Sequence, residues 1–209
     1  MSLPVTLLLG ALSFTAISHA GVSTLVPPTL PVLPTLAADS STPTCEPVER
    51  MPLEGRASPY DSVATSIGSA TVKICYGRPS ARDRTMIGGE AVPFGQLWRT
   101  GANEATILHT TGTIQVGGVL LPEGSYSIYT IPGDESWDVF FSRSIGHWGL
   151  AIDQTVRDQE VGSAQAVRER PEEYVETFTI DFRDAEDGGT HLVMEWEEFR
   201  IRLPVEAGN

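Results

Sequence analysis

The sequence has few basic residues, and this shortage narrows the classes of function it can have. Only 14 lysines and arginines stand against 27 acidic residues, which gives a formal net charge of −13 over 209 residues. Binding to nucleic-acid phosphates needs clustered Lys and Arg, and attraction to an anionic membrane surface needs them too. The composition therefore argues against a nucleic-acid-binding protein and indicates an acidic domain.

Motifs for several kinds of chemistry are missing as well. The chain holds no G-x-S-x-G nucleophile elbow, no C-x-x-C pair and no H-x-x-x-H spacing, so it lacks the usual signs of a serine hydrolase or a zinc site. The spacing of His109, His147 and His191 does not require a metal site, although a cupin-like sandwich can gather three histidines. We therefore predict no catalytic residue, no metal and no cofactor.

The chain has no lysine or arginine before Arg50, yet it begins like an export signal. An apolar run at Leu7–Leu12 is followed by Ser18-His19-Ala20, a small-x-small sequence after which signal peptidase can cut. Residues 1–20 are predicted to be a signal peptide or, because Leu3–Val26 carries no formal charge, an uncleaved membrane anchor. Both alternatives place the folded part in the periplasm or outside the cell, free or tethered to the membrane.

Residues 21–57 have the composition of a proline-rich arm. Prolines at positions 27, 28, 31, 34, 43, 47 and 52 favour extended polyproline geometry and make a semi-rigid stalk. Leucines and valines within Val26–Leu36 suit contact with a partner protein or a lipid interface, and the alternative is a disordered tail. Cys45 and Cys75 are expected to form one disulfide in an oxidising compartment, the alternative being one buried and one exposed thiol.

From residue 58 to 209 the sequence alternates polar and apolar residues with period two, and glycines mark the turns. Strands without crossover helices pair antiparallel, so we predict an all-β domain, an antiparallel, jelly-roll-like β-sandwich, over residues 58–209. Only residues 143–170 have a composition compatible with a helix. The predicted strands are 71–76, 105–110, 113–116, 119–121, 125–131, 137–142, 174–182, 191–197 and 199–205.

Two loop sequences, YGRPSARDR and WRTGANEAT, bring four arginines into this acidic chain. Guanidinium groups pair with carboxylate or phosphate oxygens, so these loops, with Trp98 as an apolar wall, are candidates for binding an anionic or sugar-like ligand or a partner. The alternative, which we favour, is a structural corner. In that corner Arg99 pairs with Glu104, and Asn103 and Thr106 cap backbone groups. With an exposed Trp148 in SIGHWGL as a further contact, the candidate binding residues are Arg78, Arg82, Arg84, Trp98, Arg99, Asn103, Glu104 and Trp148.

Glu195 and Glu197 form a second candidate site. They lie two residues apart on a predicted strand, about 7 Å from each other by strand rise, which is compatible with the carboxylate pair of an inverting glycosidase. The alternative, which we favour, is a solvent-facing strand edge beside a turn.

Several motifs taken together resemble a known bacterial family. They are IGSATVKICYGRPSARDRTMIGG, VPFGQLWRTGANEAT, GGVLLPEGSYSIYTIPGDESWDVFF and the closing L-x-x-x-W-E at Leu192–Glu197. Over residues 57–205 this set resembles the bacterial domain-of-unknown-function family 2911. The resemblance implies a β-rich, usually exported domain and no established reaction, so no catalytic residue carries over. Cys75 in the first predicted strand and the proline-rich arm depart from the usual pattern.

From these observations we predict a non-catalytic extracytoplasmic β-sandwich. It would act as an extrinsic binding or scaffold subunit that its N-terminal segment holds near a membrane-associated protein complex. The alternative is a carbohydrate- or anion-binding module that uses the arginine-rich loops. A second alternative is a glycoside-hydrolase-like or metal-dependent enzyme.

Overall fold

A computed structural model describes residues 42–46, 51–149, 152–186 and 188–208. The predicted signal or anchor and the apolar part of the arm lie outside the described residues. All described residues belong to one compact unit within Asp39–Asn209. Within these described ranges, no helix has both the length and the apolar character needed to cross a membrane.

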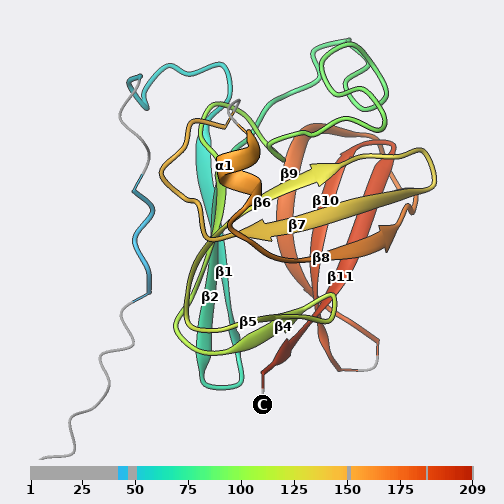
Figure 1. Cartoon of the computed structure of the whole chain (residues 1–209). Helices are drawn as coiled ribbons and strands as arrows, with labels where there is room; N and C mark the ends of the chain where they lie inside the picture. Colours follow the sequence, from blue (N-terminus) through green and yellow to red (C-terminus); the bar gives the residue numbers. More distant parts are fainter. Residues whose placement is uncertain (1–41, 47–50, 150–151, 187, 209) are drawn as a thin grey trace, which may run out of the picture. The chain divides into compact units, whose positions relative to one another are not determined.

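Two antiparallel sheets pack against each other, so the predicted β-sandwich is confirmed (Figure 1). The six-stranded sheet has the order β1-β2-β3-β6-β7-β8, and the five-stranded sheet has the order β5-β4-β11-β10-β9. Strands of the first sheet follow the chain, except that the β4–β5 hairpin leaves it and joins the second sheet. The elements are β1 (Tyr60–Ile67), β2 (Ala70–Gly77), β3 (Thr106–Thr110), β4 (Ile114–Val116), β5 (Val119–Leu121), β6 (Gly124–Ile131), β7 (Ser136–Ser142), α1 (Gln154–Arg157), β8 (Glu160–Val167), β9 (Val175–Asp184), β10 (Thr190–Glu197) and β11 (Phe199–Ala207).

The core lies between the sheets and is built from the alternating apolar residues of the strands. In β2, for example, Val72, Ile74 and Tyr76 are almost completely buried, as the period-two pattern predicted. Each fully buried large apolar side chain contributes about 1.5–3 kcal/mol of transfer free energy. The sandwich thus provides a rigid frame for the loops at its ends.

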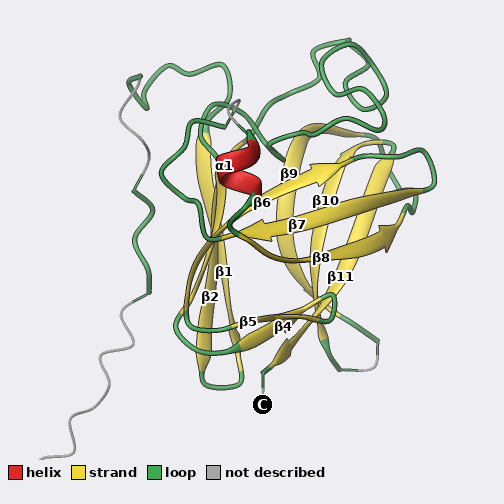
Figure 2. Ribbon diagram, viewed as in Figure 1, coloured by secondary structure: helices red, strands yellow, loops and turns green. Residues whose placement is uncertain are grey.

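The expected helix-compatible segment at 143–170 is mostly not helical. Helix α1 covers only Gln154–Arg157, and Glu160–Val167 forms strand β8 (Figure 2). None of the predicted strands covers β1. Both missed strands are the edges of the six-stranded sheet, where one neighbour is absent and most side chains are only partly buried. Edge strands therefore carry a weaker hydrophobic alternation than central ones.

Candidate functional site

The corner at 98–106 is stabilised by hydrogen bonds of its own polar groups. Trp98 exchanges two backbone hydrogen bonds with Thr130, at 2.8 and 2.9 Å. The Thr106 hydroxyl donates to the carbonyl oxygen of Thr100 at 2.6 Å, so Thr106 satisfies a backbone group as expected. Thr100 and Asn103 have positive φ values of 57° and 66°, a conformation that costs non-glycine residues energy and persists only when surrounding contacts hold it.

Two glycines explain why the YGR and WRTGAN motifs lie together. A Cβ atom on Gly77, at the end of β2, would lie 2.0 Å from the carbonyl oxygen of Ala102, and one on Gly101 would lie 2.9 Å from the carbonyl oxygen of Gly77. The backbone N–H of Ala102 donates to that Gly77 oxygen at 3.2 Å. Only glycine permits this close backbone approach, so the two loops form one joint.

Glu104 pairs with Arg56, and the predicted pairing of Arg99 with Glu104 is wrong. Arg56 Nη1 donates to both carboxylate oxygens of Glu104, at 2.7 and 2.9 Å. The two side chains are only 2% and 3% exposed. Arg56 Nε and Nη2 donate to the carbonyl oxygens of Pro52 and Met51 at 2.6 and 2.7 Å. The corner therefore holds the arm, whose arginine lies 48 residues earlier in the chain.

The arm has a second, covalent attachment to the domain. Cys45 and Cys75 form a disulfide with a Cα–Cα distance of 5.8 Å. Cys75 lies in β2 and is 1% exposed. The described part of the arm is thus fixed both to a central strand and to the corner.

Arg99 has a different environment from the one expected of it. Its Nε atom is buried without a hydrogen-bond partner among the described residues, and burial lowers the pKa of its guanidinium below the usual value. Gly149 gives its stem room, since a Cβ there would lie 2.4 Å from Arg99 Cδ. The side chain lines a hollow of about 160 Å³ with Trp98, Gly149, Ile152, Ala91 and Leu97.

The other three candidate arginines do not line that hollow, and each contacts groups of its own. Arg78 pairs with Asp61 at 2.9 Å and donates to Thr179. Arg82 donates to the carbonyl oxygen of Ala57. Arg84 Nε and Nη2 donate to the carbonyl oxygens of Ala81 and Ser80, at 2.9 and 3.3 Å. The predicted four-arginine island is therefore not one pocket.

Trp98 is a core residue, at 6% exposure. Its ring stacks on Trp196 at 5.7 Å between centroids and meets Phe178 and Trp137 edge-on at 4.9 and 6.0 Å. Such ring pairs contribute about 0.5–1.5 kcal/mol each beyond the burial of area. The indole ring therefore anchors the corner in the core, and Trp98 also lines the hollow at Arg99.

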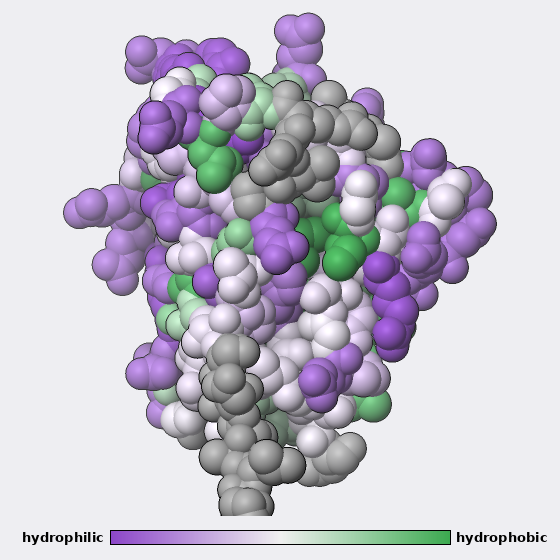
Figure 3. All heavy atoms as spheres, turned by 90° about the vertical axis from the view of Figure 1, so that its left-hand side faces the viewer, coloured by the Kyte–Doolittle hydropathy of each residue, from purple (hydrophilic) through white to green (hydrophobic). Residues whose placement is uncertain are grey.

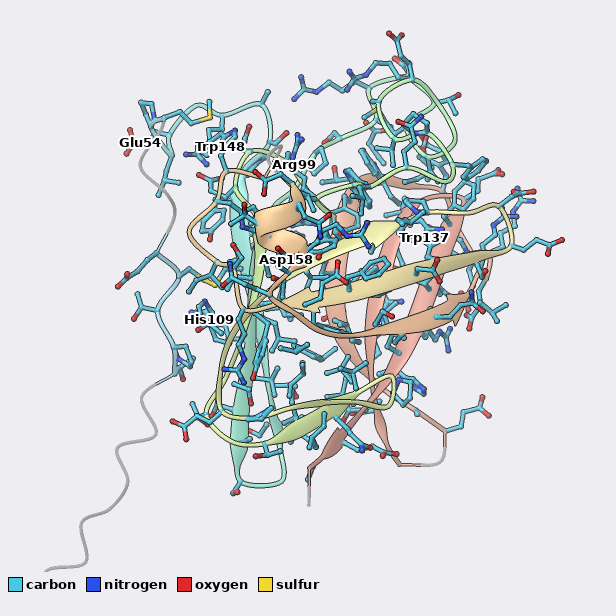
Figure 4. The ribbon with its side chains drawn as sticks, viewed as in Figure 1. Glu54, Arg99, His109, Trp137, Trp148 and Asp158 are labelled. Carbon is cyan, nitrogen blue, oxygen red and sulfur yellow. A yellow bond between two sulfur atoms is a disulfide. The ribbon has the colours of Figure 1, made fainter. Side chains whose placement is uncertain are left out.

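Trp148 is half-buried, whereas the sequence suggested a surface residue. It forms an isolated antiparallel bridge with Glu104, and the next residue, Gly149, donates to the carbonyl oxygen of Asn103 at 3.2 Å. The segment that contains SIGHWG is thus fastened along the corner. Figure 4 labels Arg99 and Trp148 at the same end of the domain as Glu54 of the arm.

Two adjoining hollows lie near Arg84 and Thr85, which line both of them. One, of about 350 Å³, is also lined by Tyr174, Phe199, Glu197, Glu198, Asp83 and Ile87. The other, of about 460 Å³, is also lined by Met86, Glu90 and Ala91. Tyr174 is 55% exposed, so an open aromatic ring lies close to carboxylates and a guanidinium.

Glu195 and Glu197 are both buried, at 5% and 6% exposure, so the favoured solvent-facing edge is wrong. Strand β10 lies between β9 and β11. Glu195 and Glu197 line two different hollows of the described structure. Burial acts to raise the pKa of Glu195, but hydrogen bonds from Arg183 and Arg200 outweigh it and leave the pKa below its usual range. A carboxylate held ionised in this way is a poor general acid.

Glu197 binds the backbone of the loop that follows β2. Its carboxylate accepts the backbone N–H groups of Met86 and Ile87 at 2.9 and 2.7 Å. The residue has a positive φ of 54° and follows a register shift in the pairing of β10 with β9. The bulge turns this side chain toward the loop after β2 and away from Glu195. The two carboxylates therefore do not form a glycosidase pair.

The histidines lie on separate elements. His109 is in β3 and its Nδ1 is 2.7 Å from the Ser125 hydroxyl, His147 is in the loop after β7, and His191 is in β10. Among the residues that the structure describes, no group of three or more His, Cys, Asp or Glu side chains is placed to hold a metal ion.

The family comparison agrees with the motifs of the corner and of β2. The model of a protein family of unknown function, DUF2911, matches residues 58–205. The chain belongs to the DUF2911 family. No curated protein and no solved structure matches the chain. In this DUF2911 protein the matched region spans β1 to most of β11, and both attachment points of the arm, Cys45 and Arg56, lie before it.

The sequence reasoning missed Arg56 and Tyr174. Arg56 was assigned to the arm, although it is the only basic residue between Arg50 and Lys73, which is a weak signal that its charge has a specific partner. Tyr174 was assigned to a strand, but it precedes β9 and lies exposed at the hollow. No local pattern distinguishes an exposed loop tyrosine from a core one.

Proposed function

We propose that this DUF2911 protein is a non-catalytic extracytoplasmic subunit that binds a membrane-associated protein complex through its N-terminal arm. The observation that carries the proposal is the double attachment of the arm. The Cys45–Cys75 disulfide and the buried Arg56–Glu104 pair bind it to the sandwich at two points. A flexible linker needs neither attachment. An arm that holds the domain in one orientation relative to a bound partner needs both. The disulfide also favours an oxidising compartment.

The charged groups of the domain support a role without catalysis. Glu104, Glu195 and Glu197 are the buried acids of the described residues, and each is engaged by arginines or backbone N–H groups. Their carboxylate oxygens accept hydrogen bonds from groups of the protein itself, so none of the three is placed to take a proton from a substrate.

One face of the domain also favours binding through the arm. On the face drawn in Figure 3, hydrophobic residues lie in small areas separated by hydrophilic ones. Stable protein interfaces have an apolar centre, and on that face no broad apolar area is visible among the described residues. The leucines and valines of Val26–Leu36 would supply it.

Purification from native membranes tests this proposal. The tagged full chain is extracted with a mild detergent and compared with a variant in which the Leu and Val residues of 26–36 are replaced by serine. The matched control replaces Leu120 and Val167, which are 48% and 73% exposed on the sandwich. We expect the wild type and the control to elute in a stoichiometric complex and the arm variant to elute alone. A wild-type protein that always runs at its monomer mass contradicts the proposal.

A carbohydrate-binding module is the second candidate, and the hollow at Arg84 favours it. An exposed aromatic ring, Tyr174, beside Glu198 and Arg84 offers a face for a sugar ring and partners for its hydroxyl groups. A thermal-shift screen against a glycan panel tests it. A sugar that stabilises the wild type and the Val167→Ala control, but not Tyr174→Ala, supports this candidate. A panel without any stabilising member contradicts it.

A further inference from the structure

Arg99 is a partly buried cation without an acidic partner among the described residues. The chain has 27 acidic and 14 basic residues, so most arginines find a carboxylate easily. Arg56, Arg183 and Arg200 all do. The Nε–H group of Arg99, by contrast, is buried and donates to no described group, and burial lowers the pKa of the guanidinium.

Neighbouring residues fix the position of Arg99. The residue on its N-terminal side, Trp98, is locked in the aromatic cluster, and Thr100 on the other side has a left-handed conformation held by hydrogen bonds. Gly149 leaves room for the Arg99 stem, because any Cβ there would overlap Cδ. These contacts hold the side chain at the hollow and leave few alternative rotamers.

The hollow around the guanidinium is small, and its exposed lining is more polar than apolar. Apart from Arg99 itself, the described residues that line it carry no charged side chain; they are Ala91, Leu97, Trp98, Gly149 and Ile152. A volume of about 160 Å³ suits a group of a few heavy atoms. An uncompensated charge in such a place is costly, and a planar oxyanion that accepts two N–H groups relieves that cost.

We propose that the hollow at Arg99 binds a carboxylate group carried on a short apolar chain. The guanidinium would hold the carboxylate oxygens, and Leu97 and Ile152 would contact the alkyl part. A single arginine matches the single charge of a carboxylate, whereas phosphate carries more charge than one guanidinium can neutralise. This site shares Ala91 with one of the two hollows at Arg84 but no lining residue with the hollow at Tyr174, so it does not depend on the function proposed above.

Calorimetric titration of the purified full-length protein tests the proposal with butyrate as probe. Butyramide, which has nearly the same shape but no charge, and inorganic phosphate are titrated in parallel. We expect saturable binding of butyrate to the wild type and no binding of butyramide. Arg99→Met should weaken butyrate binding roughly 10- to 100-fold, because it removes charge-assisted hydrogen bonds. Arg202→Met, at an arginine outside this hollow whose side chain is 42% exposed, is the matched control and should bind like the wild type.

A second measurement, of stability, tests the proposal without any probe. Without ligand, Arg99→Met should unfold at a denaturant midpoint equal to or above that of the wild type, because it removes a buried charge that has no partner. A clearly lower midpoint would reveal a partner and overturn the proposal. So would equal butyrate binding by Arg99→Met, absence of butyrate binding in the wild type, or tighter binding of phosphate than of butyrate.

Discussion

Removing the arginine of the buried Arg56–Glu104 pair should destabilise the domain strongly. In Arg56→Met the methionine fills much of the space of the arginine stem but leaves the Glu104 carboxylate, 3% exposed, without its two hydrogen bonds. Loss of one partner from a buried ion pair costs about 3–5 kcal/mol, because the other charge stays buried and unpaired. The carbonyl oxygens that Arg56 also binds belong to Met51 and Pro52, which are exposed, so water can replace those bonds.

The expected loss can be measured by urea and thermal unfolding followed by circular dichroism. For a chain of this size, 1 kcal/mol corresponds to a shift of about 2–4 °C in Tm, so Arg56→Met should melt about 6–20 °C below the wild type. The double variant Arg56→Met/Glu104→Leu should recover most of this loss, since apolar residues often replace a buried ion pair with little cost. A double-mutant cycle would then show a large coupling energy.

Two results would refute this reasoning. If Arg56→Met lies within about 1 kcal/mol of the wild type, the pair is solvated like a surface salt bridge. If the double variant loses the sum of the two single losses, the residues act independently. In either case the corner would not be an anchor for the arm.

Three further predictions concern the same end of the domain and the second sheet. Replacing Cys45 and Cys75 by serine opens a loop with a sequence separation of 30 residues and should cost about 3–4 kcal/mol relative to the oxidised wild type by the chain-entropy relation, measured by urea denaturation; the reduced wild type should lose about as much. Gly149→Ala should cost about 1–3 kcal/mol, because its Cβ would lie 2.4 Å from Arg99 Cδ; an unchanged denaturation midpoint would show that the stem moves freely. The pKa of Glu195 is lowered in the folded protein from 4.5, so its stabilising effect should be complete above about pH 5 and decline as the pH falls. The difference in unfolding free energy between wild type and Glu195→Gln should therefore be constant near neutral pH and shrink in acid, and a difference that grows in acid would contradict it.

The all-β class could be predicted because its signal is local. Alternation along β2, β6 and β10 and glycines at turns determine strands within a few residues, so the sandwich was evident from residues alone. Strands β1 and β8 were not predicted from the sequence because an edge strand buries only part of one face. Ala164 and Ala166, the buried residues of β8, are also small, and alanine is common in helices as well.

The partners of charged side chains could not be predicted in the same way. Arg99 and Glu104 are five residues apart and looked like a pair, yet the backbone turns of the corner direct them to different surroundings. Glu104 meets Arg56, which the fold brings from 48 residues away, and Arg99 lies over Gly149 at a hollow. The bulge in β10 likewise separates Glu195 from Glu197, which looked like a pair by spacing.

The sequence by itself determined the all-β class, the acidic character and the family motifs of this DUF2911 protein, because each depends on composition or on neighbours along the chain. Only the tertiary structure decided which arginine neutralises which acid and that Arg99 has no acidic partner among the described residues. An ion pair forms when segments that are distant in sequence come together. The alternation of polar and apolar residues along the chain does not show which segments these are. Those pairings make the WRTGANEAT corner an anchor for the described part of the arm and leave Arg99, within that corner, as the residue for which we propose a ligand.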